Sequence, residues 1–348
     1  MLFKKILVNL GLFLGTLLFF FVLGEIAARV WYAYRGTIMQ FDRILGSCTK
    51  PNLHQERRVV DAGGVESVVR LTTDRNGFRC FGDVHATRPK VFCVGDSMTF
   101  ARDVSDEQTY YALLKDGLDV EVFAYGAEGF ATLQEYLILD RYFDLIKPDV
   151  VVWQFCRNDM IGNTLELESQ STLNNNGMRR PYWTPDREVV YACPRFLGPL
   201  RGVVQSYSNL AYFVFVHLDR VVDVRLLSST VENEIETQGM NHAGFQRAAA
   251  ITTSLMGKVR QRCGSAWILA FDSDAIIPYL EAFRDACEKN GVSFVDDVGR
   301  RIDEAEQKGI VTKAADGAHW NAEGHRICAE ALMKHIAGHV GITLRAPS

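Results

Sequence analysis

Five short apolar runs alternate along the chain with stretches in which apolar residues recur every three or four positions. The runs are VFCVG at 91–95, VEVFA at 120–124, VVVWQF at 150–155, WILAF at 267–271 and VSFV at 292–295. They are almost continuously apolar, as strands covered on both faces are. Helical spacing fills 107–118, 133–146, 243–262, 277–290 and 322–336. The alternation predicts an α/β fold in which a parallel five-stranded sheet has helices on both faces.

The start of the chain differs from the rest. Paired lysines precede an apolar stretch from Ile6 to Gly24, which one amide interrupts. Roughly 20 apolar residues cross the hydrocarbon core of a bilayer, so this stretch is long enough. A cleaved signal peptide is the alternative, although the EIAAR that follows fits a small-residue cleavage site poorly. We expect residues 1–35 to be an uncleaved transmembrane anchor with a short cytoplasmic tail, and the rest to be extracytoplasmic.

The remaining chain divides into a lead-in and a main domain. The lead-in, 36–89, carries a turn signal in DRNG at 74–77. The main domain, 90–348, is interrupted over 160–240 by a polar loop at 169–185 and an apolar helical stretch over 210–227. We interpret that helix as part of the scaffold, with a lid or a membrane contact as the alternatives.

Composition narrows the function classes. The chain has 348 residues, 48% of them hydrophobic, a net charge of −4 and a pI of about 6.1. This balance indicates a globular protein with a substantial core and argues against nucleic acid as a partner. The oligomeric state does not follow from it.

Eight cysteines are spread along the chain without a CxxC pair, so we expect no zinc cluster. Cys93 and Cys156 are assigned to strands, as buried apolar residues. One or two disulfides are open in an oxidising compartment, and their pairing does not follow from the sequence.

Polar segments follow three of the predicted strands: DS at 96–97, YGAEG at 125–129 and CRND at 156–159. In open parallel sheets, ligands bind outside the carboxyl ends of the strands. The three segments should therefore meet at one edge of the sheet and form the site.

An acyl-transfer site needs a nucleophile, a base, a group that orients the base and donors for an oxyanion. Ser97 can be the nucleophile, or a turn former and helix cap. Of eight histidines, His319 has the most suggestive setting, because Asp316 lies three residues before it in ADGAHWN. Asp316 can orient the imidazole, or the pair can be a local surface hydrogen bond. The amide of Asn158 and the backbone N–H of Gly129 can serve as oxyanion donors, or be ordinary turn residues.

In that order, VGDSMTFA, AYGAEG, CRNDM and ADGAHWNAEGH resemble the four sequence blocks of the SGNH hydrolases, also called GDSL-like esterases and lipases. TTDRNGFRC and DVSDEQTYYALL resemble the membrane-anchored bacterial branch. The resemblance covers about 70–160 and 265–340. This sequence departs from the family pattern at Ala101 and Cys156, where many members have glycine.

The resemblance implies a three-layer α/β/α sandwich of flavodoxin-like type. It makes Ser97 the nucleophile, His319 and Asp316 its base and orienter, and Ser97, Gly129 and Asn158 the oxyanion hole. Gly126 is the less suitable donor. No metal or organic cofactor is required.

The expected reaction is hydrolysis of carboxylic esters, O-acetyl or short-acyl, through an acyl-enzyme on Ser97. An acylated glycan or a lipid could carry the ester. An O-acyltransferase that modifies a cell-surface polysaccharide is the alternative, because the motifs do not distinguish water from a sugar hydroxyl as acceptor. A binding module without turnover is a third reading, and retention of the complete residue set argues against it.

Overall fold

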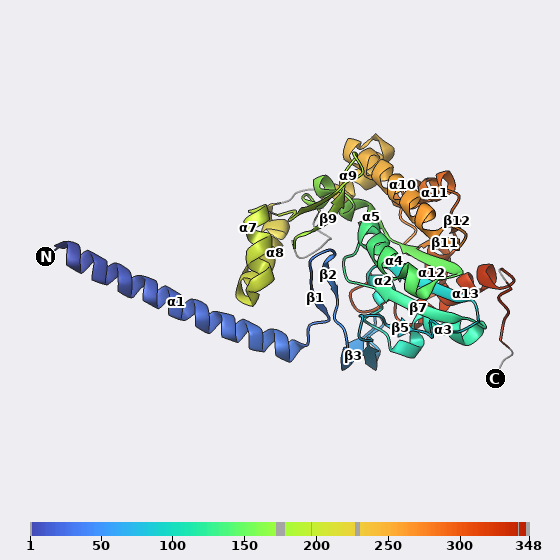
Figure 1. Cartoon of the computed structure of the whole chain (residues 1–348), viewed down its shortest axis with the longest axis horizontal. Coiled ribbons are helices and arrows are strands. Elements are labelled where there is room, and N and C mark those ends of the chain that lie inside the picture. Colours follow the sequence, from blue (N-terminus) through green and yellow to red (C-terminus); the bar gives the residue numbers. More distant parts are fainter. Residues whose placement is uncertain (1, 172–177, 196, 227–229, 340, 346–348) are drawn as a thin grey trace.

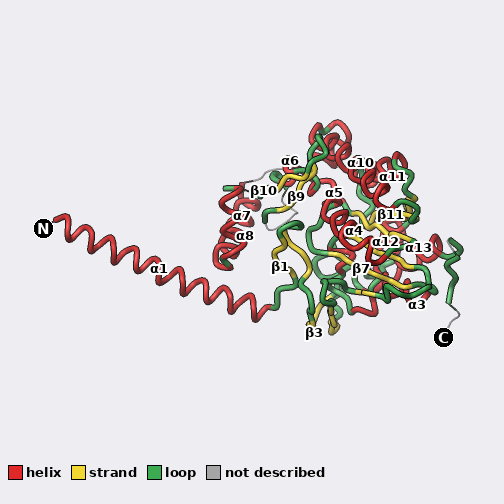
Figure 2. Tube along the Cα trace, in the orientation of Figure 1, coloured by secondary structure: helices red, strands yellow, loops and turns green. Residues whose placement is uncertain are grey.

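A six-stranded sheet forms the centre of the computed structural model, which describes residues 2–171, 178–195, 197–226, 230–339 and 341–345 (Figures 1 and 2). Its order is β12-β11-β8-β6-β7-β5. The five parallel strands are β6 (Lys90–Gly95), β7 (Glu121–Gly126), β8 (Val150–Phe155), β11 (Trp267–Asp272) and β12 (Ser293–Val295). Each matches one predicted run to within a residue or two. Taken in chain order, the five follow the 2-1-3-4-5 arrangement of flavodoxin-like sheets.

The predicted strand count was one too low. The lead-in supplies a sixth strand, β5 (Cys80–Phe81), which pairs antiparallel with β7 at the edge of the sheet. Two residues are too few to show a strand period, so only the pairing reveals this strand.

Helices cover both faces of the sheet, which gives the predicted three layers. One face packs against α4 (Thr132–Ile146), α10 (Ala243–Cys263) and α11 (Tyr279–Lys289). The other packs against α3 (Tyr110–Gly117), which follows the short η1 (Asp106–Gln108), and against α12 (Val298–Gln307) and α13 (Ala322–Ile336). α12 was not predicted, although its buried Val298, Ile302 and Ala305 recur at helical spacing.

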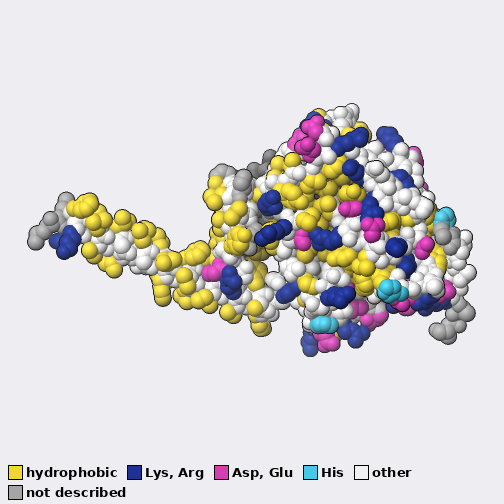
Figure 3. All heavy atoms as spheres, viewed as in Figure 1, with side chains coloured by type: hydrophobic (Ala, Val, Ile, Leu, Met, Phe, Trp, Pro, Cys, Tyr) yellow, Lys and Arg dark blue, Asp and Glu magenta, His cyan; other side chains and the backbone are white. Residues whose placement is uncertain are grey.

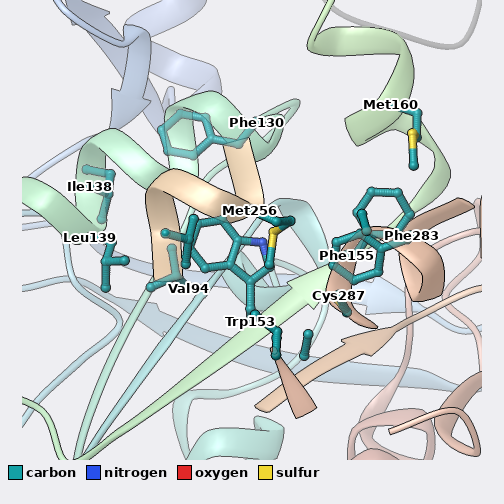
Figure 4. Close-up of a cluster of buried hydrophobic side chains, with 14 of the residues drawn as sticks. Val94, Phe130, Ile138, Leu139, Trp153, Phe155, Met160, Met256, Phe283 and Cys287 are labelled. Atoms are coloured by element: carbon teal, nitrogen blue, oxygen red, sulfur yellow. The ribbon is translucent and has the colours of Figure 1, made fainter. Parts of the chain in front are cut away.

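The larger core centres on Trp153 of β8, which is fully buried. Figure 4 shows its indole beside Met256, with Ile138 and Leu139 from α4 in the same cluster. Further along β8, Phe155 stacks on Phe283 of α11 with the ring centroids 3.8 Å apart. This packing fixes β8, whose end carries one segment of the predicted site, against the helices on this face.

The lead-in forms two hairpins, β1 (Met39–Asp42) with β2 (Gly46–Thr49) and β3 (His54–Val60) with β4 (Glu66–Thr72). The predicted turn at 74–77 is present: Gly77 N–H donates to the Asp74 carbonyl over 3.1 Å. Asp74 Oδ1 accepts from the N–H groups of Asn76 and Phe78, both at 2.8 Å. The turn directs the chain into β5.

The interruption over 160–240 holds more structure than predicted. It contains α5 (Arg157–Gly162), α6 (Leu165–Glu168), β9 (Arg180–Trp183), β10 (Val189–Ala192), α7 (Gly198–Tyr207), α8 (Asn209–Leu226), α9 (Val231–Gln238) and η2 (Gly239–Asn241). The predicted loop at 169–185 was partly wrong, because β9 lies in it and pairs with β10; its residues 172–177 fall outside the described residues. The predicted helix over 210–227 is α8, and residue 227 is not among those described.

The N-terminal helix α1 (Leu2–Arg35) projects away from the rest of the molecule (Figure 1). Within it, Phe3–Tyr34 is long and apolar enough to cross a membrane, with a mean hydropathy of 2.5 and no buried residue in the most apolar window. By length and composition, this helix is compatible with a membrane anchor or with a signal sequence.

Candidate active site

Ser97 lies at the first position of α2 (Ser97–Phe100), immediately after β6. Asp96 is fully buried and caps the helix, because its Oδ1 accepts a hydrogen bond from Met98 N–H at 2.9 Å. The strand thus turns into a helix within one residue. Ser97 is left half-buried at the carboxyl edge of the sheet.

Side chains from β8 and from the lead-in form hydrogen bonds to the turn that carries Ser97. Gln154 Oε1, on the neighbouring strand β8, accepts from Asp96 N–H and from the Thr99 hydroxyl, both at 3.0 Å. Arg79 of the lead-in donates to the carbonyls of Phe100 at 2.6 Å and Ala101 at 2.7 Å. A buried side chain from a sequence-distant segment therefore neutralises the carbonyl end of this short helix.

Ala101 stands at a position where the SGNH hydrolases that the sequence resembles often have glycine. It closes α2 with φ 54° and ψ 51°, in the left-handed region that favours glycine. The chain keeps the turn with alanine in place of glycine, and the Arg79 hydrogen bond to the Ala101 carbonyl stabilises that conformation.

His319 joins Ser97 and Asp316 in one hydrogen-bonded chain. Its Nε2 lies 2.8 Å from Ser97 Oγ, and its Nδ1 lies 2.6 Å from Asp316 Oδ2. The Asp316 carboxylate is itself fixed, because Oδ1 accepts from the backbone N–H groups of Ala318 and His319, each at 3.0 Å. The DxxH segment thus reaches a serine more than two hundred residues away in the sequence.

The protonation state of this chain follows from Asp316. Partial burial raises the pKa of this carboxyl, but the hydrogen bonds from His319 and from two backbone N–H groups outweigh it and hold the pKa well below the usual range. An ionised carboxylate only accepts hydrogen bonds, so the proton between the two side chains is on Nδ1 of His319. In the neutral imidazole, Nε2 then carries a lone pair that faces the Ser97 hydroxyl.

Charged side chains surround this hydrogen-bonded chain. Arg102 donates to Asp316 Oδ2 at 3.1 Å and to Asp103 Oδ2 at 3.1 Å, and it approaches Glu128 at 3.4 Å. Asp103 also pairs with Arg57 of β3, at 3.2 Å. Burial raises the pKa of Glu128, and Arg102 counters that effect. The immediate rim of the site is therefore strongly polar.

Asp103, Asp316 and His319 each place one ligand-type atom within 4.8 Å of the others. Arg57 and Arg102 contact the two carboxylates of that group and offset their negative charge. These contacts leave the cluster poorly suited to a cation.

The sheet order places the two oxyanion candidates on opposite sides of Ser97. β6 lies between β7 and β8, so Gly129, after β7, and Asn158, on α5 after β8, flank the serine at the same edge. Asn158 Nδ2 donates to the carbonyl of Phe130 at 3.2 Å, which links the two segments directly. Gly129 has φ 68°, and its N–H donates to no group in the described part of the chain. The segments that follow β7 and β8 are thus linked at the edge of the sheet that carries Ser97.

Gly126 has a packing role. A Cβ at this position would lie 2.2 Å from the backbone nitrogen of Phe100 and 2.6 Å from the carbonyl oxygen of Asp96. The end of β7 therefore packs backbone to backbone against the turn that carries Ser97. Its carbonyl accepts from the Thr49 hydroxyl at 2.7 Å.

The assignment of Cys156 to a strand was wrong. β8 ends at Phe155, and Cys156 is the half-buried residue that precedes α5, whereas Cys93 is buried in β6 as predicted. The thiol of Cys156 contacts Asn158 Oδ1, and burial raises the pKa of that thiol well above its ordinary value. The neutral thiol donates to Oδ1 while Nδ2 donates to the Phe130 carbonyl, so both ends of the Asn158 amide are held. Within the described chain Cys48, Cys80, Cys93, Cys156, Cys263, Cys287 and Cys328 are free thiols.

Arg180 is a contributor that sequence reasoning missed. It lies on β9, is almost fully buried, and donates through Nη1 to the Gly129 carbonyl and to Glu168 Oε1, both at 2.9 Å. Its Nη2 contacts Gln134 Oε1. The interruption thus braces the loop of Gly129. No local pattern marked this arginine, because its partners are distant in the sequence.

Fold and site together define the class: a flavodoxin-like α/β protein with a serine, histidine and aspartate in hydrogen-bonded sequence at the carboxyl edge of its sheet. No protein-family model and no curated protein matches the chain.

Several solved structures resemble the chain. One is titled as LAE5, an alpha/beta hydrolase enzyme from a Lake Arreo metagenome, with 15% identity and a TM-score of 0.38 over 73% of this chain and 97% of that one. Another is the lipase/acylhydrolase from Enterococcus faecalis, with 14% identity and a TM-score of 0.40 over 75% of this chain and 99% of that one. A third is a variant of Axe2, an acetylxylan esterase from Geobacillus stearothermophilus, with 14% identity and a TM-score of 0.38 over 72% of this chain and 95% of that one.

Proposed function

We propose that the protein is a serine esterase of the SGNH hydrolase type, which hydrolyses carboxylic esters through an acyl-enzyme on Ser97. The observation that carries the proposal is the hydrogen-bonded chain from Asp316 through His319 to Ser97. It joins the first and last of the four sequence blocks. Such an arrangement can activate a serine hydroxyl without a cofactor.

In the first half-reaction, Ser97 Oγ attacks the ester carbonyl carbon while its proton passes to His319 Nε2. Asp316 stabilises the imidazolium that forms. The tetrahedral intermediate collapses when the C–O bond to the alcohol breaks, and His319 returns the proton to the departing alkoxide. The acyl group then remains on Ser97.

In the second half-reaction, water attacks the acyl-enzyme with His319 as the base. The carboxylic acid leaves, and Ser97 regains its proton. In both halves the N–H groups of Ser97 and Gly129 and the amide of Asn158 stabilise the oxyanion, which is the largest single contribution in many acyl-transfer sites. Arg180 and Cys156 position two of these donors.

The charged rim supports a short acyl group. Four charged side chains form a network of ion pairs beside Asp316 and His319, and their desolvation by a long alkyl chain would cost free energy: Arg57, Arg102, Asp103 and Glu128. An O-acetyl or short-acyl ester on a glycan, or on a lipid headgroup, places polar atoms there instead. We therefore propose short-acyl esters of such carriers as substrates.

We further propose that residues 1–35 anchor the protein in a membrane and that the esterase domain, 90–348 with its insertion at 160–240, lies on the extracytoplasmic side. The lead-in at 36–89 connects the two. The support is the length and hydropathy of α1 and the paired lysines at its start.

The test is hydrolysis of p-nitrophenyl acetate and longer p-nitrophenyl esters by the full chain in detergent micelles. Ser97→Ala should abolish turnover and fluorophosphonate labelling while the fold is retained. Ser67→Ala, at an exposed serine on β4, is the matched control and should behave as wild type. Turnover that survives in Ser97→Ala would refute the proposal. Labelling without hydrolysis, with acyl transfer to an added glycan, would identify a transferase instead.

A further inference from the structure

Two helices of the interruption, α7 and α8, form an apolar hairpin joined only by Ser208. Leu200, Val203 and Tyr207 recur on one face of α7 and are 62%, 55% and 78% exposed. On α8, Val214, Leu218 and Val221 also share a face and are 43–53% exposed. Leu197 and Phe213 are exposed as well. Figure 3 shows this apolar surface beside α1.

Exposed charge is lacking on the described side chains of this hairpin, between positions 197 and 221. The charged side chains described there are Arg201 and Asp219, and they pair with each other across the two helices. Arg201 is almost fully buried, and it also lies over the ring of Phe215. Contiguous exposed apolar surface of this kind marks a site of interaction with a partner or a membrane.

The hairpin is fixed to α1 at the residue where the apolar stretch of α1 ends. Glu25 accepts from the Ser208 hydroxyl at 2.8 Å and from the N–H groups of Asn209 at 3.1 Å and Leu210 at 3.0 Å. It thereby caps the start of α8. Leu210 packs directly on Gly24, where an added Cβ would lie 2.9 Å from the leucine side chain.

Two more contacts continue this attachment toward the end of α1. Arg29 donates to the Tyr207 carbonyl at 3.3 Å, and the rings of Tyr32 and Tyr212 lie 5.7 Å apart. α7 and α8 then run across the direction of α1 (Figure 1). If Ile6–Gly24 crosses the bilayer, the hairpin lies at the level where the chain leaves it.

We propose that the α7–α8 hairpin is a membrane-surface element, whose apolar face lies in the headgroup and acyl-chain boundary beside α1. The occupant of that face is lipid, because the surface is continuous with the membrane-crossing helix and presents no charge among its described side chains. Interfacial helices insert their apolar face by roughly 5–10 Å. The proposal rests on α1 as an anchor, and it would hold the esterase domain in a fixed orientation over the membrane.

Membrane contact through the hairpin would also set the position of the Ser97 site relative to the membrane surface. The hairpin continues from β9 and β10, and Arg180 of β9 holds the Gly129 loop. Seating the hairpin on lipid would therefore keep the site near esters at the membrane surface.

The test measures how deeply one position of the hairpin lies in lipid. The full chain with Leu218→Trp is reconstituted in phosphatidylcholine vesicles, with or without phosphatidylcholine brominated along the acyl chain. Leu344→Trp is the matched control: Leu344 is 65% exposed and lies near the C-terminus, which Figure 1 places at the far end from the start of α1. Wild-type fluorescence is subtracted from both. Because an interfacial helix inserts its apolar face by roughly 5–10 Å, we expect brominated lipid to lower the added Leu218→Trp signal and to leave the Leu344→Trp signal unchanged.

Equal quenching of the two added tryptophans would overturn the proposal. So would quenching at Leu218→Trp that disappears when the protein is diluted to about one copy per vesicle, because that result would identify a second copy as the cover. Near-ultraviolet circular dichroism of each variant checks the fold. Alkaline extraction of the same vesicles tests the anchor separately, and hydrolysis of p-nitrophenyl acetate is not needed for the outcome, so failure of the esterase proposal would be distinguishable.

Discussion

The substitution Asp316→Asn tests whether the orientation of His319 governs activity. Asp316 Oδ1 is held by two backbone N–H donors at 3.0 Å, and an asparagine would keep its carbonyl oxygen there. The NH₂ group would then replace Oδ2, which now accepts from His319 Nδ1 and from Arg102. The asparagine side-chain amide cannot flip by 180° without losing both hydrogen bonds to the backbone N–H groups.

The imidazole must respond to that NH₂ group. Nδ1 would become an acceptor, so the ring proton would move to Nε2, which faces Ser97. A protonated Nε2 cannot take the serine proton. Triads with the wrong tautomer lose about 10⁴-fold in kcat, which corresponds to about 5 kcal/mol of transition-state stabilisation.

The assay is the kcat for p-nitrophenyl acetate of the full chain in micelles, with thermal unfolding as the check on the fold. Asp103→Asn is the matched control, because Asp103 pairs with Arg57 and Arg102 and makes no hydrogen bond to His319. We expect the control to retain kcat within about tenfold, because it weakens ion pairs to Arg57 and Arg102 and leaves the hydrogen bonds of His319 in place. If Asp316→Asn loses no more than its control does, the tautomer argument is refuted.

Three further predictions follow from other contacts. Asn158→Ala should lower kcat by about 10²–10³-fold with little change in KM, as loss of one oxyanion donor does, and an unchanged kcat would remove Asn158 from the oxyanion hole. Arg180→Met should leave the buried Glu168 carboxylate unpaired and lower the free energy of unfolding by about 3–5 kcal/mol in urea titrations, whereas Arg187→Met, at an exposed position, should match wild type. Burial lowers the pKa of His325 to about 3, so the folded state binds fewer protons than the unfolded state. The free energy of unfolding should therefore be at its full value above pH 6.5 and fall by about 2 kcal/mol as the pH drops to 5. His325→Gln should reduce this dependence on pH.

The parallel sheet could be predicted because its strands β6, β7, β8 and β11 are buried on both faces almost throughout their length. Such strands are continuous apolar runs, and the residues around Val91 and Val150 show this without any neighbour in view. β5 could not be predicted, because its two residues become a strand only by pairing with β7. α12 was missed although its apolar spacing is regular.

The candidate site divides in the same way. Ser97, Asn158 and Gly129 stand at strand ends, and strand ends of a parallel sheet share an edge, so their convergence could be expected from the sequence. The contributions of Arg79 and Arg180 could not, because their partners become neighbours only after folding.

By itself, the sequence determined the alternating α/β pattern, the apolar start of the chain and the order of the polar segments, since these depend on local residue type and spacing. Only the tertiary structure decided that His319 reaches Ser97, that Ala101 takes a left-handed conformation, and that α7 and α8 stand against α1. Those features depend on contacts between distant segments. Periodicity reports which face of an element is apolar, and it carries no information on what that face meets.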